Sequence, residues 1–170
     1  MPEILMPEIL MRGGDSAYML RTATDGDIAQ VAAIDVSITG IEKPGYWEDI
    51  HERYVRQPAE DVALAKLNRL FLCACQGEKV IGFIVGEIRA WEFGSAPCGW
   101  VFAVGVHRDV RTRYVAQTLF QAVCDSFRQA GVTIIRTMLA RDNTLAMSFF
   151  RSQGMIAGPF IQLEMELDAP

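Results

Sequence analysis

The chain has 170 residues, a formal net charge of -5 and a hydrophobic content of 51%. This length and composition favour one globular domain with its own apolar core and give no sign of disorder. The acidic balance argues against nucleic acid as the main partner, and no apolar run reaches the roughly 20 residues that a membrane span needs. The N-terminus lacks the charged-then-apolar order of a signal peptide, and we therefore expect a cytoplasmic protein with neither a nucleic-acid nor a membrane partner.

Cysteine spacing and the N-terminal residues set two further expectations. Cys73, Cys75, Cys98 and Cys124 match neither a zinc pattern nor a C-x-x-C redox pattern, so we interpret them as small buried hydrophobic residues and expect no metal. Residues 1–10 contain MPEIL twice, which is too short for a repeat architecture. We leave residues 1–15 out of the fold as a loosely held segment and expect residues 16–170 to form a single domain.

The hydrophobic pattern predicts alternating short strands and amphipathic helices along that domain. In chain order the expected elements are a strand over 17–23, a helix ending near Gly40, a helical piece over 45–56, an ambiguous stretch over 57–69, strands over 71–76, 79–91 and 98–106, a helix ending at Gly131, a strand over 132–139, a helix over 143–153 and a strand over 156–167. Three hairpin-connected strands followed by helical crossovers favour an α/β fold, with a mixed, mostly antiparallel sheet of about six to seven strands and helices on both faces.

Local signals refine this pattern. Thr24 with Asp27 resembles a capping box at the start of the first helix, and Gly77 with Glu78 marks the turn of a hairpin. Strict alternation along the strand over 98–106 predicts one shared face for a set of large side chains: Trp100, Phe102, Val104 and Val106.

The most informative segment is the corner between the strand over 98–106 and the helix that follows it. The polar loop at this corner carries Arg108, Arg111 and Arg113. Backbone N–H groups at a helix N-terminus, together with positive charge, form a place where a phosphate binds. The corner therefore predicts a phosphorylated cofactor, although the same arginines also fit a solvated basic loop.

Two segments carry a resemblance to a known family. Residues 106–116, VHRDVRTRYVA, resemble the acyl-CoA loop V-x-x-x-x-[RQ]-x-x-G-x-[GA], and residues 143–155, NTLAMSFFRSQGM, resemble the helix pattern N-x-x-A-x-x-[FL]-[YF]-x-x-x-G-[FM]. These motifs are those of the GNAT superfamily of acyl-CoA-dependent N-acyltransferases, which the chain resembles over about residues 18–167. Tyr114 stands where the loop motif has glycine, and Phe150 stands where many members have a tyrosine that protonates the departing thiolate.

The resemblance implies a GNAT-like fold and transfer of an acetyl group from acetyl-CoA to a primary amine by direct attack in a ternary complex. The backbone N–H near Val106 would polarise the thioester carbonyl in the manner of an oxyanion hole. The remaining cofactor contacts would come from the strand before the loop, from the loop with its helix N-terminus and from the second motif. The implied cofactor-binding residues are Val104, Val106, Arg111, Thr112, Arg113, Tyr114, Val115, Ala116, Asn143 and Phe150.

The base that would deprotonate the acceptor amine is less clearly marked. Glu87 is the main catalytic candidate because it is a charged residue in an otherwise apolar strand, although an outward-facing strand residue gives the same pattern. His107, just after the strand over 98–106, is the second candidate. Residues 41–54 either line an acceptor pocket or form an amphipathic helix that packs on the core. The side chains that would line the pocket are Tyr46, Trp47, Glu48, Asp49 and His51.

Tyr114 and Phe150 leave an alternative open, namely a catalytically altered module of the same fold that binds or senses acyl-CoA or pairs with another protein. A small nucleotide-binding α/β protein is disfavoured, since the chain has neither a P-loop nor a G-x-G-x-x-G motif. The expected partners are acetyl-CoA and an amine on a small molecule or a protein. A strand edge expected at the C-terminus also favours a homodimer.

Overall fold

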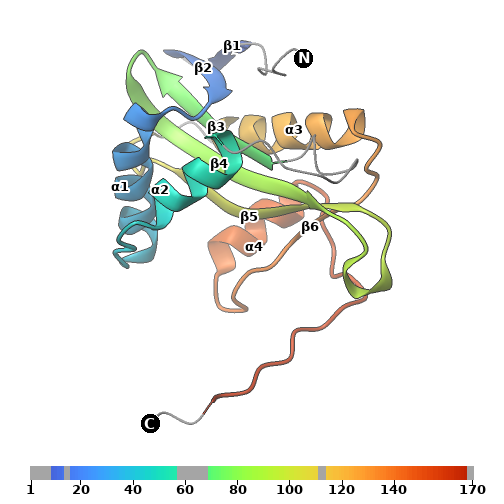
Figure 1. Ribbon diagram of the computed structural model, residues 1–170. Coiled ribbons are helices and arrows are strands. Elements are labelled where there is room, and N and C mark those ends of the chain that lie inside the picture. The colour runs from blue at the N-terminus through green and yellow to red at the C-terminus, as the bar shows by residue number, and fades with distance from the viewer. Residues whose placement is uncertain (1–8, 14–15, 57–68, 111–113, 168–170) are drawn as a thin grey trace. The chain divides into compact units, whose positions relative to one another are not determined.

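The computed structural model describes residues 9–13, 16–56, 69–110 and 114–167 (Figure 1). The chain divides into two compact units, Met1–Met138 and Leu139–Pro170, and each is described by itself. The single domain expected over residues 16–170 stays a prediction.

The first unit is built on a six-stranded sheet whose spatial order follows the chain. Neighbouring strands are antiparallel from β1 to β5, and β6 runs parallel to β5. This arrangement confirms the mixed, mostly antiparallel sheet that the sequence predicts. The strands are β1 (Ile9–Gly13), β2 (Ser16–Thr22), β3 (Arg69–Gln76), β4 (Lys79–Arg89), β5 (Cys98–Val106) and β6 (Ile135–Thr137).

Helices cover both faces of this sheet, as expected (Figure 1). In the first unit, α1 and α2 lie on one face and α3 lies on the other, whereas α4 belongs to the second unit. Short 3₁₀ turns precede α1 and join β4 to β5, and a π-helical turn continues α2. The helices are α1 (Ile28–Thr39), α2 (Tyr46–His51), α3 (Tyr114–Gln129) and α4 (Thr144–Ser152).

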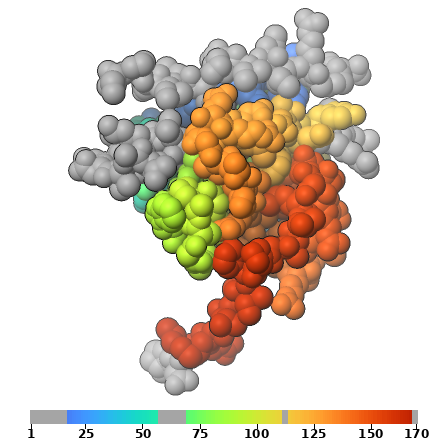
Figure 2. Space-filling model, turned by 90° about the vertical axis from the view of Figure 1, so that its right-hand side faces the viewer, coloured from blue at the N-terminus to red at the C-terminus, as the bar shows by residue number. Residues whose placement is uncertain are grey.

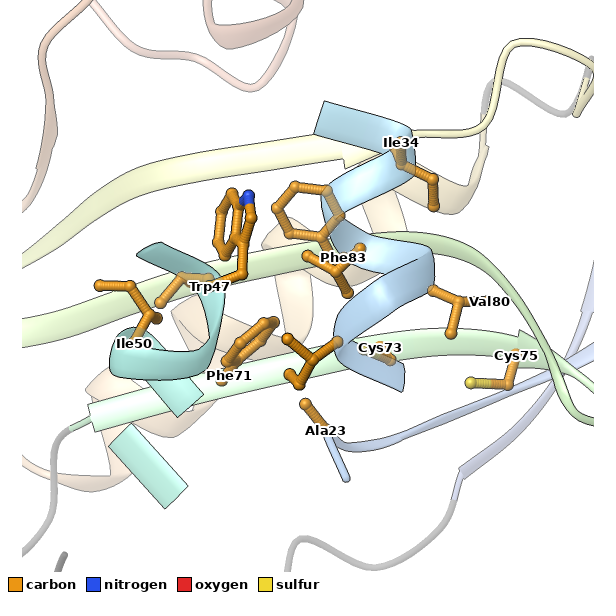
Figure 3. Close-up of a cluster of buried hydrophobic side chains, with 12 residues drawn as sticks. Ala23, Ile34, Trp47, Ile50, Phe71, Cys73, Cys75, Val80 and Phe83 are labelled. Carbon is orange, nitrogen blue, oxygen red and sulfur yellow. The ribbon is translucent and has the colours of Figure 1, made fainter. Parts of the chain in front are cut away.

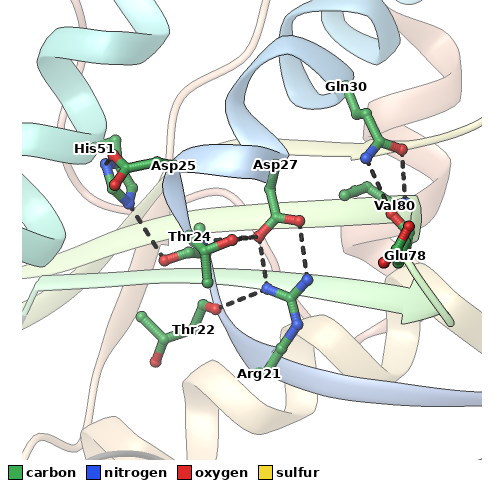
Figure 4. A network of polar contacts seen from close by, with 10 residues as sticks. Arg21, Thr22, Thr24, Asp25, Asp27, Gln30, His51, Glu78 and Val80 are labelled. Atoms are coloured by element: carbon green, nitrogen blue, oxygen red, sulfur yellow. Dashed lines mark hydrogen bonds and ion pairs between the residues drawn. The ribbon is translucent and has the colours of Figure 1, made fainter.

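The start of α1 is anchored to β2 by a buried ion pair (Figure 4). The Asp27 carboxylate accepts hydrogen bonds from Thr24 N–H at 2.7 Å and Thr24 Oγ1 at 2.8 Å, which confirms the capping box. Arg21 donates to both carboxylate oxygens, at 2.5 and 2.9 Å. Burial alone would raise the pKa of Asp27, but the hydrogen bonds from Arg21 and Thr24 outweigh it and hold that pKa below its ordinary value of 3.8.

An apolar core joins α1 and α2 to the sheet (Figure 3). Phe71, Cys73 and Cys75 alternate along β3 and are all buried on this face. The Trp47 ring from α2 lies edge-on to Phe83 with the ring centroids 5.0 Å apart. Burial raises the pKa of the Cys73 thiol well above its ordinary value, which agrees with the interpretation of this cysteine as a small hydrophobic residue.

Glycines on the opposite face let α3 approach the sheet closely. A Cβ added at Gly99 would lie 2.2 Å from Cδ2 of Phe127, and one added at Gly82 would lie 3.0 Å from Cγ1 of Val115. Because Gly82 pairs with Val106, the first turn of α3 lies next to the end of β5. The buried stripe of α3 is the one that the sequence predicts: Val115, Leu119, Phe120, Val123 and Phe127.

A bulge in β5 breaks the alternation that the sequence suggests. Val85 pairs with Ala103, whereas the next residue, Gly86, pairs with Val101, so Phe102 is an extra residue in the ladder. Side chains before and after the bulge change faces relative to a regular strand. We expected four side chains of this strand to share one face: Trp100, Phe102, Val104 and Val106. The bulge shows that this prediction is wrong.

The strand content differs from expectation at both ends of the chain. Ile9–Gly13, which we expected to be a loosely held segment outside the fold, forms a strand that pairs antiparallel with β2. The strand expected over 132–139 is shortened to Ile135–Thr137. The prediction of a strand over 156–167 is wrong, because this segment has no regular secondary structure. It runs as an extended chain, which is coloured red in Figure 2. Its apolar residues alternate as in a strand, but no described residue pairs with it, and Ile156 is 90% exposed.

Candidate functional site

One backbone edge of β5 lacks a strand partner over the C-terminal half of the strand. His107 N–H donates to the Ile81 carbonyl at 2.8 Å, and because such bonds alternate in an antiparallel ladder, the N–H and C=O groups of Val104 and Val106 point away from β4. On that other side, β6 pairs only with residues 99–101 of β5. Among the described residues, no strand pairs with the backbone of Val104 and Val106, which are the groups expected to contact the cofactor.

The N-terminus of α3 lies at the same corner. Tyr114 is the first residue of this helix, and 62% of its surface is exposed, whereas Val115 is buried and Ala116 is half-buried. The first N–H groups of an α-helix have no intrahelical partner and are available to an anion. Arg111, Thr112 and Arg113 lie outside the described residues, so their roles stay predictions.

Glu87, the main candidate base, belongs to a cluster near the C-terminal end of β4. Arg89 Nε donates to Glu87 Oε1 at 2.7 Å, and Arg69 Nε lies 3.9 Å from Oε2. Burial, followed by a hydrogen bond to Glu87, raises the pKa of the Tyr54 hydroxyl above its ordinary value of 10.0. Only 17% of the Glu87 side chain is exposed, so it is a half-buried, ion-paired carboxylate and not a solvated strand residue.

Aromatic rings flank both arginines of this cluster. The Arg69 guanidinium lies 5.5 Å from the centroid of the Tyr54 ring, and that of Arg89 lies 5.2 Å from the Trp100 ring. The Trp100 indole N–H is buried and, in the described part of the chain, has no hydrogen-bond partner. Sequence reasoning missed these neighbours of Glu87. Only Arg89 could have been found, because residues two apart in a strand share a face.

The segment over 41–54 packs on the core through three buried side chains: Trp47, Ile50 and His51. Trp47 and His51 are buried, and the Trp47 indole N–H donates to Asp35 Oδ2 at 3.1 Å. Lys43 Nζ lies 2.7 Å from the same oxygen, so the loop between α1 and α2 is fixed by one buried carboxylate. Of the expected acceptor-pocket residues, these three are exposed: Tyr46, Glu48 and Asp49.

His107 is distant in the sheet from Glu87. It lines a cavity of about 350 Å³ together with Lys79 and Val80, at the start of β4, whereas Glu87 is near the end of that strand. The Nδ1 atom of His107 lies 3.7 Å from Asp109 Oδ2. The structure therefore does not bring the two candidate bases into one site.

The second unit holds the other motif. The Asn143 side chain accepts a hydrogen bond from Ala146 N–H at 3.0 Å, which makes it the N-cap of α4. Phe150 is buried, and its ring lies 5.1 Å from that of Phe149. The expected contacts of Asn143 and Phe150 with the cofactor stay predictions.

These features define a mixed α/β domain in which an open strand edge meets a helix N-terminus at one corner. The family model described as the acetyltransferase (GNAT) family matches residues 37–155, more than half of the chain. The chain therefore belongs to the GNAT family, as its two motifs suggest.

Solved structures support the same fold. A transcriptional regulator from Bacillus halodurans C-125 is 17% identical, with a TM-score of 0.70 over 88% of this chain and 99% of that one. The aminoglycoside 6'-N-acetyltransferase AAC(6')-IG from Acinetobacter haemolyticus is 16% identical, with a TM-score of 0.69 and the same coverage. AAC(6')-Iy in complex with CoA is 14% identical, with a TM-score of 0.72 over 95% of this chain and 99% of that one. No curated protein sequence is significantly similar to the chain.

Within residues 9–13, 16–56, 69–110 and 114–167, no three side chains of His, Cys, Asp or Glu come together as metal ligands would. No helix there combines the length and the apolar composition that crossing a bilayer requires.

Proposed function

We propose that this protein is an N-acetyltransferase that transfers an acetyl group from acetyl-CoA to a primary amine by direct attack in a ternary complex. Family membership supports acetyl transfer in general. The observation that carries the finer proposal is the unpaired backbone edge of β5 at Val104 and Val106. Such an edge offers N–H and C=O groups to an amide-containing arm in the way that a further strand would.

In this proposal the corner between β5 and α3 binds the cofactor. Arg111 and Arg113 supply positive charge, and the first N–H groups of α3 supply donors for the diphosphate. The N–H of Val106 points to the open side of β5, where it would stabilise negative charge on the thioester oxygen. The other residues assigned to cofactor binding are Val104, Thr112, Tyr114, Val115, Ala116, Asn143 and Phe150.

The residues that the structure describes at this corner fit such a ligand. Tyr114 replaces a glycine of the family motif, and a bulky side chain there would block the helix N-terminus if it folded inward. The side chain is instead mostly exposed, and the buried neighbour is Val115, which packs toward the sheet. The orientation of Tyr114 therefore supports access of a phosphate to the first turn.

Glu87 is the proposed acceptor-side carboxylate. At pH 7, deprotonation of a lysine-like amine costs about 4.6 kcal/mol, and deprotonation of an α-amine costs about 1 kcal/mol. A half-buried carboxylate beside aromatic rings attracts an ammonium group and accepts its proton, directly or through water. Arg69 and Arg89 hold the carboxylate in position on the sheet.

Binding is tested by thermal unfolding of the full chain with increasing acetyl-CoA. Ligand at 100 times its dissociation constant adds about 2.7 kcal/mol of stability, so a clear rise in Tm is expected. Ala116→Asp places a negative charge in the first turn of α3 and should abolish the rise, whereas Ala122→Asp makes the same change in the middle of the helix and should leave it intact. A wild-type protein whose Tm does not move at millimolar acetyl-CoA would contradict the proposal.

A catalytically altered module is the second candidate, and Phe150 is the residue that favours it. Phenylalanine cannot protonate a thiolate, so a chain that retains cofactor binding and has lost transfer fits the same sequence. A thiolate with a pKa of about 8.5 leaves without strong acid assistance, which is why transfer is the function that we propose.

A further inference from the structure

The cavity beside His107 is not used in the proposed transfer. It has a volume of about 350 Å³ and lies on the α1 side of the sheet, the face opposite α3. Ala33, Ile34 and Val80 are the apolar lining residues, and Lys79, His107 and Arg108 add nitrogen-bearing side chains.

Hydrogen bonds from three elements frame this cavity. Gln30 Nε2 donates to the Glu78 carbonyl at 3.0 Å, and Val80 N–H donates to Gln30 Oε1 at 2.9 Å (Figure 4). These bonds attach α1 to the turn between β3 and β4. The His107 N–H, bonded to the Ile81 carbonyl at 2.8 Å, attaches the end of β5 to the same strand. The cavity is therefore formed before any ligand binds.

The cations at the cavity differ from those elsewhere on this side of the sheet. Arg21, Arg53, Arg56 and Arg89 each have a carboxylate partner. Lys79 and Arg108 form no ion pair with any residue that the structure describes, although the chain as a whole is acidic. Unpaired cations that line a preformed cavity are placed to meet an anion.

The acidic group at the cavity does not cancel the positive charge of its lining residues. Asp109 is the one acid among the lining residues, and its carboxylate is mostly exposed and lies 3.7 Å from the His107 ring. Lys79 and Arg108 together exceed the charge of Asp109 by one unit. The net charge of the lining residues is therefore positive, which favours an anionic ligand.

We propose that this cavity binds a phosphate monoester, with its phosphate at Lys79 and Arg108 and its carbon body against Ala33 and Val80. A dianionic phosphate accepts several hydrogen bonds at once, as the ammonium and guanidinium groups require. The phosphate has two sources: a separate small phosphorylated metabolite, or the ribose 3'-phosphate of coenzyme A, which the proposed function would bring to the neighbouring loop. The phosphate site itself does not depend on the transferase proposal.

The chain has two histidines, and this gives a direct test. His107 lines the cavity, whereas His51 is buried on α2 and serves as an internal reference. Inorganic phosphate is titrated into the full chain at constant pH and ionic strength, and the imidazole NMR signals are followed. We expect a saturable shift of the His107 signals with those of His51 unchanged, and Lys79→Gln should weaken the apparent affinity about tenfold. Arg128→Gln, on the opposite face, should leave the titration as it is in the wild type.

Two results would overturn the site: a His107 shift that does not saturate, or a saturable shift that Lys79→Gln leaves unchanged. Comparison of coenzyme A with dephospho-coenzyme A then identifies the source. Competition of phosphate with coenzyme A but not with the dephospho form assigns the cavity to the cofactor, and simultaneous binding assigns it to a separate metabolite. Phosphate binding without any coenzyme A binding would support the cavity and contradict the transferase, so the two failures are distinguishable.

Discussion

The Arg21–Asp27 pair at the start of α1 and the Glu87 cluster at the end of β4 use the same chemistry in two different settings. The Asp27 side chain is 4% exposed, and Thr24 and Arg21 both donate hydrogen bonds to its oxygens. Glu87 is half-buried, and its partners Arg69 and Arg89 are both substantially open to solvent.

This difference separates a structural ion pair from a candidate functional one. A sealed carboxylate whose oxygens are all occupied has no capacity left for a ligand, so it contributes to stability. The guanidinium groups of the Glu87 cluster are open to solvent, so we propose that this cluster contributes mainly to binding and chemistry.

Glu87→Gln should give the largest effect. If Glu87 accepts the amine proton, kcat falls about 1000-fold, equivalent to about 4 kcal/mol, because an amide cannot act as a base. The free energy of unfolding should change by less than about 1 kcal/mol, since the pair is partly exposed. Steady-state kinetics and urea denaturation measure the two quantities, with Glu78→Gln, at an exposed position in the turn before β4, as the matched control. An unchanged kcat would remove Glu87 from the mechanism.

Asp27→Asn should lower the stability of the protein and leave its catalytic rate unchanged, the opposite of Glu87→Gln. Loss of the buried charge leaves Arg21 without its partner and lowers the free energy of unfolding by about 3 kcal/mol. Urea denaturation should show a lower midpoint with an unchanged m-value, and kcat of the folded protein should stay the same. A variant as stable as the wild type would mean that the Asp27 pair is no more structural than the Glu87 cluster.

The stability that the Arg21–Asp27 pair contributes should depend on pH. The folded-state pKa of Asp27 is below its ordinary value of 3.8, so its contribution is present above that value and is lost as the pH falls through the lower, folded-state pKa. The stability gap between wild type and Asp27→Asn should therefore close as the pH is lowered below about 3.8 in a series of denaturation curves. A gap of constant size would show that the ionised carboxylate is not its source.

The smallest effect is expected from a fully exposed ion pair. Arg53 and Asp49 lie 2.7 Å apart on the surface of α2 and its continuation, where solvent screens both charges. Arg53→Gln should cost no more than about 0.5 kcal/mol of stability and should leave transfer unchanged. A loss of stability comparable to that of Asp27→Asn would show that burial does not determine how much each ion pair contributes to the free energy of unfolding.

Local sequence signals predicted the first unit well. The capping box at Thr24, the hairpin turn at Gly77 and the apolar stripe of α3 each depend on near neighbours, and all three are present. The bulge at Phe102 was hidden because alternation of side chains does not reveal where the ladder gains a residue. The segment over 156–167 has the pattern of a strand, but pairing depends on a distant partner that the pattern does not specify.

The candidate site was predicted in part. Glu87 was recognised as unusual because it is charged within an apolar strand, but its partners Tyr54 and Arg69 come from other elements and depend on strand register. The cavity was missed for the same reason, since Lys79 and Arg108 line one cavity only when β4 and β5 pair. The backbone edge at Val106 is invisible in side-chain patterns, and only the resemblance to the GNAT motifs indicated it.

Acetyl transfer itself is tested most directly by the release of free thiol from acetyl-CoA in the presence of a panel of amines. The proposal predicts thiol release that requires both the protein and an amine, saturates with each and is lost in Glu87→Gln. Saturable binding of acetyl-CoA without thiol release for any α-amine, lysine-like amine or aminoglycoside would contradict the proposal and assign the chain to the binding modules of the GNAT fold.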